Sequence, residues 1–151
     1  MQYKNYFKSR YAAPKESNEQ VALFQWAAYA EKQYPELRGL FHVPNGGARD
    51  KITGARLKRE GVKAGVPDVL LLVARGEFHG LAVEMKRQQG GCLSQNQKTW
   101  LNRLNAQGYK AVACKGATEA IKTITEYLNL GRFCRVDAEA VEAVLGGICD
   151  G

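Results

Sequence analysis

Two acidic residues flank a predicted β-hairpin near the middle of the chain. Asp68 stands at the start of an apolar strand, and Glu84 lies in the next strand with Lys86 two positions later. Because side chains alternate between the faces of a strand, Glu84 and Lys86 project from the same face. A turn near Gly76 can bring Asp68 toward Glu84. Two carboxylates this close repel unless a cation neutralises them, so the spacing predicts a shared cation site.

The oxygen ligands of this site favour a hard divalent cation, Mg²⁺ or Mn²⁺. The backbone carbonyl of Met85 could supply a further oxygen. Such an ion polarises a phosphodiester and acidifies a bound water. Lys86 could orient or activate that water, or stabilise charge developing on phosphorus, and the sequence leaves these roles open. In the alternative interpretation, Asp68 caps a strand while Glu84 and Lys86 form a solvated pair on an outer face.

The elements that must position these residues follow from periodicity and capping signals. Ser17 and Gln20, and again Ser94 and Gln97, have capping-box spacing at the start of apolar helical patterns. Thr118 is the predicted cap of the last helix. The fold class is therefore mixed α/β, a sheet of about four strands flanked by helices. Helices are expected at 17–34, 53–60, 94–107 and 118–128, and strands at 40–43, 69–73, 81–86 and 111–114.

The chain's 151 residues correspond to one ordinary domain. We expect a basic arm at 1–16, the domain itself at 17–130 and a tail at 131–151. The longest apolar run, 69–74, cannot span a bilayer, and the polar start of the chain is unlike a signal peptide. The four cysteines are scattered without metal-ligand spacing, which favours free thiols in a cytoplasmic protein.

The net charge of +7 is concentrated in parts of the chain. Residues 1–15 contain lysine and arginine but no acidic residue, and residues 38–63 and 84–115 are each strongly basic. Clustered positive charge favours a polyanionic partner, most simply nucleic acid, although a solvated basic surface is the alternative. Candidate phosphate contacts are Arg49, Lys51, Arg56, Lys58, Arg59 and Lys63.

These residues resemble the PD-(D/E)xK nuclease superfamily and, more specifically, its VRR-NUC domain. The resemblance runs from about residue 19 to residue 128. Beyond the catalytic pattern of 67–68 and 84–86, it includes the segments HVPNGG at 42–47, LKREGV at 57–62 and GVPD at 65–68. It also includes LSQNQ at 93–97. It implies a restriction-endonuclease-like core and a metal-dependent nuclease.

The resemblance also implies residue roles. Asp68 and Glu84 would be metal ligands, Lys86 the catalytic lysine, and Gln97 a polar site residue. Glu19 would reach the metal from the first helix. Glu19 has an alternative role as an acid at a helix N-terminus, and Gln97 as the capping partner of its helix. His42 could face the site or the DNA, or be an ordinary packed residue.

Stand-alone members of this family resemble virus-type proteins that act on branched DNA as homodimers. By this analogy we expect a homodimeric endonuclease that resolves four-way (Holliday) junctions, phage-encoded and acting inside a bacterial host. A C2 dimer would supply the two sites needed to cut two strands symmetrically. The alternatives are a flap or single-strand nuclease, and a DNA-binding module that does not cleave.

Overall fold

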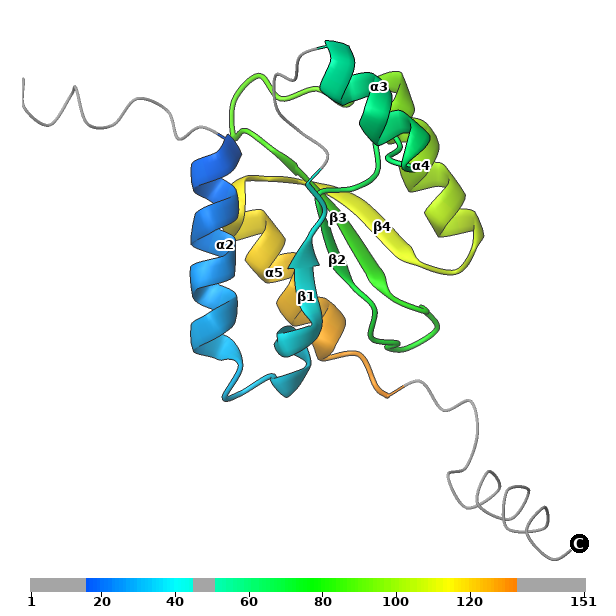
Figure 1. Cartoon of the computed structure of the whole chain (residues 1–151). Coiled ribbons are helices and arrows are strands. Elements are labelled where there is room, and N and C mark those ends of the chain that lie inside the picture. Colours follow the sequence, from blue (N-terminus) through cyan, green and yellow to red (C-terminus); the bar gives the residue numbers. More distant parts are fainter. Residues whose placement is uncertain (1–15, 45–50, 133–151) are drawn as a thin grey trace, which may run out of the picture.

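A computed structural model describes residues 16–44 and 51–132 of the chain (Figure 1). Within these ranges, helices and strands follow one another in the predicted α/β order. No helix in this part of the chain is long and apolar enough to cross a membrane. In chain order the elements are α2 (Glu16–Ala30), the 3₁₀ helix η1 (Pro35–Gly39), β1 (Leu40–His42), α3 (Lys51–Arg59), β2 (Val69–Leu71), β3 (Leu81–Lys86), α4 (Gln95–Ala106), β4 (Lys110–Lys115) and α5 (Gly116–Leu128).

The strands form one mixed sheet in the order β1-β2-β3-β4. The pairs β1–β2 and β2–β3 are antiparallel, whereas β3 and β4 run parallel. Val69 pairs with Val83 in the central hairpin. Continuing this register by one residue sets Asp68 opposite Glu84, on the same face of the sheet. The predicted four-stranded mixed sheet is confirmed.

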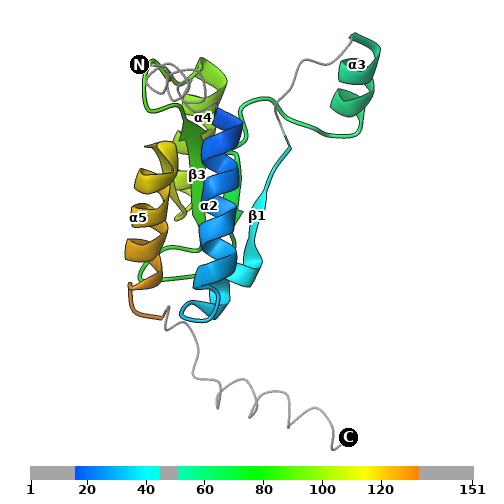
Figure 2. The same ribbon diagram turned by 90° about the vertical axis from the view of Figure 1, so that its left-hand side faces the viewer.

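Helices cover the two faces of the sheet unequally. Helices α2 and α5 lie side by side on one face, where Leu23, Ile124 and Tyr127 pack with Val83 and Met85 (Figure 2). Helix α4 covers the other face, where its buried Leu101 meets Ala82 and Ala111. The alternation along β3 therefore turns Glu84 and Lys86 toward the face that carries α4.

Helix α3 stands apart from the sheet and from the other helices (Figure 2). Its sequence, KITGARLKR, carries Arg56, Lys58 and Arg59 in the last turn and no acid in the first. All three basic residues are exposed. This helix therefore presents a projecting, positively charged surface.

Two predictions about helix ends were wrong. The first helix ends at Ala30 rather than near Tyr34, and Tyr34 has left helical geometry before Pro35, which begins η1. The last helix begins at Gly116, and Thr118 does not cap it. Carboxylates satisfy the free N–H groups there instead: Glu119 accepts from the Lys115 N–H at 2.7 Å and Glu19 from the Ala117 N–H at 2.7 Å. The Ser17 side chain lies outside the described residues.

Candidate active site

The end of the central hairpin brings the two predicted acids together. The Asp68 Oδ2 atom accepts a hydrogen bond from the Met85 N–H at 2.9 Å. This bond fixes the Asp68 carboxylate at the point where the β2–β3 ladder ends. Because Met85 directly follows Glu84, the same bond holds the Asp68 carboxylate beside the Glu84 position. The strand pairing thus produces the convergence that the sequence predicted.

The Asp68 backbone is fixed as well. Its carbonyl oxygen accepts from the Val43 N–H at 2.8 Å and lies 2.8 Å from His42 Nδ1. His42 is exposed, so its ring forms part of the surface beside the acids. Of the uses that the sequence left open for His42, contact with the site's backbone is the one this geometry shows. The pairing of β1 with β2, which sets His42 opposite Val69, is the signal that links it to Asp68.

Glu84 lies at the centre of this cluster and is 1% exposed. Its Oε1 atom lies 3.0 Å from Lys86 Nζ and also accepts from Gln97 Nε2. Its Oε2 atom is buried, and no hydrogen-bond partner for it exists within the described ranges. One oxygen of this carboxylate is therefore held by two donors, while the other lacks a partner.

Burial raises the pKa of Glu84 from its ordinary 4.5 to about 7. The negative charge of Asp68 and the contact between the two carboxyl groups act in the same direction, whereas Lys86 lowers the pKa. The raised pKa therefore reflects first the burial of Glu84 and second the neighbouring charge of Asp68.

Gln97 makes the capping contacts that the sequence predicted and also contacts the acidic cluster, while its role in catalysis stays a prediction. Its side-chain Oε1 atom accepts from the Ser94 backbone N–H at 2.8 Å, and its backbone N–H donates to Ser94 Oγ at 3.3 Å. These two bonds complete the capping box of α4. Its Nε2 atom donates to Glu84. The start of α4 is thus tied directly to the acidic cluster.

Glu19 is 6% exposed and lies on α2, which packs on the opposite face from α4. Its Oε2 atom accepts from the Ala117 N–H, as described above. Among the residues that the structure describes, no three His, Cys, Asp or Glu side chains are grouped to hold one ion. The proposed metal-ligand role of Glu19 stays a prediction, as does that of the Met85 carbonyl.

The predicted phosphate contacts lie near this site in the sequence but are only partly described. Arg56, Lys58 and Arg59 are exposed on α3, and Lys63 is exposed in the loop that leads to β2. Arg56 Nε lies 3.4 Å from Glu60 Oε1. Arg49 lies outside the described residues, and so does the side chain of Lys51.

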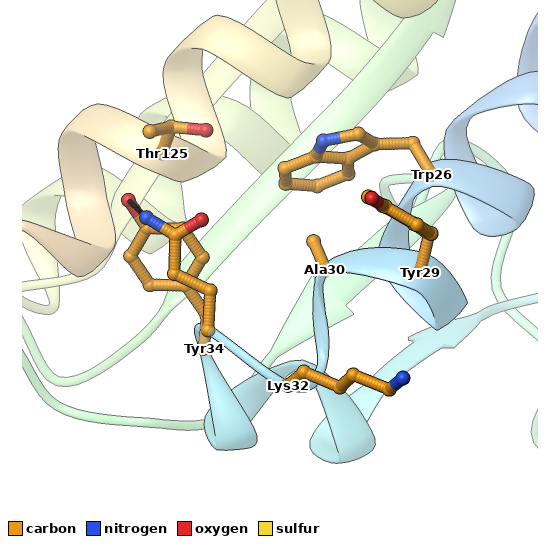
Figure 3. Close-up of a pocket in the computed structure, with 7 residues that line it drawn as sticks. Trp26, Tyr29, Ala30, Lys32, Tyr34 and Thr125 are labelled. Carbon is orange, nitrogen blue, oxygen red and sulfur yellow. Dashed lines mark hydrogen bonds between the residues drawn. The ribbon is translucent and has the colours of Figure 1, made fainter.

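A separate cavity of about 520 Å³ lies at the C-terminal end of α2 (Figure 3). Aromatic rings of Trp26, Tyr29 and Tyr34 line it, together with Lys32. None of the predicted site residues contributes to its wall. The acidic cluster and this cavity are therefore distinct features of the molecule.

The structure is thus an α/β domain in which two acids from paired strands lie beside a lysine on a mixed four-stranded sheet. Residues 11–118 match the VRR-NUC domain family. A solved structure described as a VRR_NUC domain protein has 32% sequence identity and a TM-score of 0.69, over 80% of this chain and 93% of that chain. A search among curated proteins gives no match. The chain belongs to the VRR-NUC family, whose domains are nucleases that process DNA.

Proposed function

We propose that this protein is a metal-dependent endonuclease that hydrolyses DNA phosphodiester bonds. The observation that carries the proposal is the convergence of Asp68 and Glu84 from paired strands, with Lys86 Nζ 3.0 Å from Glu84. Family membership supports nuclease chemistry, and the net charge of +7 supports a polyanionic substrate.

The residues fit a divalent cation. The Glu84 Oε2 atom is a buried acceptor without a partner among the described residues, next to a second carboxylate. Asp68 and Glu84 would hold Mg²⁺ or Mn²⁺, which two carboxylates can bind together with waters and substrate phosphate oxygens. When bound, the ion would supply positive charge that polarises the phosphodiester and lowers the pKa of a water.

The chain's own side chains have distinct tasks in this proposal. The Lys86 ammonium group lies beside the two acids, where it can orient the attacking water or stabilise negative charge on the phosphate. Gln97 holds one Glu84 oxygen and leaves the other for a cation. His42 and Val43 hold the backbone of Asp68, which keeps its carboxylate in register with β3.

We further propose that the substrate is branched DNA, in particular a four-way junction, and that the protein acts as a homodimer. Symmetric cutting of two strands needs two active sites, which a C2 dimer provides. Exposed basic side chains on α3 and in the loop after it support contacts with the DNA backbone. Contacts of this kind do not depend on the DNA sequence.

The test is to incubate the protein with a labelled four-way junction, a flap and a linear duplex, each with Mg²⁺, Mn²⁺ or EDTA. Paired nicks in the junction, present with metal and absent with EDTA, are expected. Cleavage of the flap alone would replace the junction by the flap or single-strand alternative. Binding without cleavage would identify a non-cleaving module. Gel-filtration mass tests the dimer.

Asp68→Asn should abolish cleavage and preserve DNA binding, because an amide oxygen can still accept from the Met85 N–H while the charge is lost. Glu77→Gln, in the exposed turn of the hairpin, is the matched control and should leave cleavage unchanged. Full activity of Asp68→Asn would overturn the assignment of this acid to the site.

A further inference from the structure

A groove bordered by two basic side chains lies between the loop that leads into β2 and one side of α4. It has a volume of about 440 Å³, a size in the range of small-ligand pockets. The residues that line it are Lys63, Ala64, Asn96, Thr99, Trp100 and Arg103. The four α4 residues are spaced at intervals of three and four, so they form one stripe along the helix.

The groove is positively charged. Lys63 and Arg103 are exposed, and no acidic residue is among the lining residues that the structure describes. Helix α4 itself, QNQKTWLNRLNA, contains no acid. The charge of Lys63 and Arg103 is therefore not neutralised within the described groove wall, and Asn96 adds an amide to the lining.

Tight packing defines the shape of the groove. The Trp100 indole N–H donates to the Ala64 carbonyl at 3.1 Å, which joins the helix to the loop. Gly65 has φ +84°, and a Cβ atom placed there would lie 2.7 Å from the Asn96 backbone carbonyl carbon. Only glycine permits this approach, so the loop lies directly against the first turn of α4.

Both walls of the groove continue into the acidic cluster. Asn96 precedes Gln97, whose amide holds Glu84. The loop runs from Ala64 to Asp68, a stretch of chain that spans at most roughly 14 Å. Successive phosphates of one strand rise by about 3.4 Å along duplex DNA, so the Ala64 edge of the groove lies within about four nucleotides of Asp68.

We infer that this groove binds the phosphodiester backbone of the strand being cut, within about four nucleotides of the scissile phosphate. Lys63 and Arg103 contact phosphates, and the Asn96 amide donates a hydrogen bond to a phosphate or sugar oxygen. The Thr99 hydroxyl donates to the Gln95 carbonyl at 2.9 Å and only lines the groove. Trp100 positions the loop. The inference rests on the proposed nuclease function and adds α4 to the DNA-binding surface, which the sequence had assigned only to basic residues from 49 to 63.

The first test measures binding without cleavage. A fluorescein-labelled four-way junction is titrated in EDTA at several salt concentrations with wild type and with the double variant Lys63→Gln/Arg103→Gln. Loss of two phosphate contacts should make the slope of log affinity against log salt shallower by about 1.4–1.8. This corresponds to an affinity loss of about 15- to 30-fold at 0.15 M salt.

The matched control is Arg38→Gln/Lys122→Gln, which removes the same two residue types from η1 and α5. Both control side chains are about three-quarters exposed, and they pair with Glu31 and Glu126 respectively. The control should keep the wild-type slope. Thermal unfolding of both double variants checks that neither change disturbs the fold. An equal slope change in both double variants would overturn the inference, because it would report total charge rather than the groove.

The second test locates the contact. Neutral methylphosphonate linkages are placed one at a time at the four positions on each side of the cleaved bond. Wild-type affinity should fall at one or two of these positions, and the double variant should be insensitive there. A position-independent response would overturn the inference.

The outcomes separate this inference from the proposed function. If wild type cleaves DNA and the double variant keeps the wild-type slope, the groove assignment fails while the nuclease stands. If no substrate is cleaved with any metal and the slope still falls as expected, the nuclease proposal fails while the groove stands as a DNA-binding site.

Discussion

Metal-free protein should lose stability as the pH rises from 5 to 8, and Glu84 should be the cause. The pKa of this carboxyl is about 7 in the folded protein, against an ordinary value of 4.5. The folded state therefore binds the proton more tightly than the unfolded state does. Its contribution to stability is complete below pH 4.5 and is lost as the pH rises through 7. The shift corresponds to a loss of about 3 kcal/mol in the free energy of unfolding.

The assay is urea denaturation in EDTA at pH 5, 6, 7 and 8 for wild type and Glu84→Gln. The variant resembles the protonated acid and does not titrate. When its free energy of unfolding is subtracted from that of wild type at each pH, the contributions of all other titrating groups cancel. That difference should move by roughly 2–3 kcal/mol in favour of the variant between pH 5 and 8, because part of the full loss already occurs below pH 5. Glu77→Gln, at an exposed acid, should follow wild type throughout.

Addition of Mg²⁺ or Mn²⁺ at pH 8 should restore stability to wild type and not to Glu84→Gln, because only the ionised acid offers the ion a full charge. A wild-type-minus-variant difference that stays constant within about 0.5 kcal/mol from pH 5 to 8 would refute the reasoning, since that is the usual error of such comparisons. The burial of Glu84 would then not disfavour its charged form.

Three further outcomes follow from contacts around the site. Ser94→Ala should lower stability by about 1 kcal/mol in urea denaturation through loss of the α4 cap, with cleavage unchanged because the Ser94 N–H still holds Gln97. Gln97→Ala should in addition weaken metal binding roughly 10- to 100-fold in calorimetric titration, since Glu84 loses a donor; equal metal affinity in both variants would contradict the double role. Gly65→Ala should cost at least about 1 kcal/mol more than Gly61→Ala, because both have positive φ but only Gly65 faces backbone at 2.7 Å.

The sequence predicted the elements better than their ends. The Leu81–Lys86 strand and the Ser94 cap were correct because alternation and capping spacing are local signals. Thr118 was a wrong cap because the group that satisfies the Ala117 N–H is Glu19, 98 positions away in the chain. A contact between the first and last described helices leaves no trace in a local pattern.

The acidic cluster was predictable in its members but not in its details. The register Val69–Val83 is what sets Asp68 opposite Glu84, and a hairpin of this length permits other registers. The partnerless Glu84 Oε2 atom and the packing of Gly65 against α4 depend on tertiary packing. The groove beside α4 was missed because Asn96, Thr99 and Arg103 look like an ordinary solvated helix face.

The place of β3 within the sheet has a consequence for a chain that is still being synthesised. Glu84 and Lys86 belong to a strand whose outer neighbour, β4, begins only at Lys110. Until that segment leaves the ribosome, β3 is an unprotected edge and its backbone groups on that side face water. A fragment that stops short of β4 carries every proposed catalytic side chain yet lacks the rigid support that aligns them. The acidic cluster therefore gains this support only once the Lys110–Lys115 segment has been made.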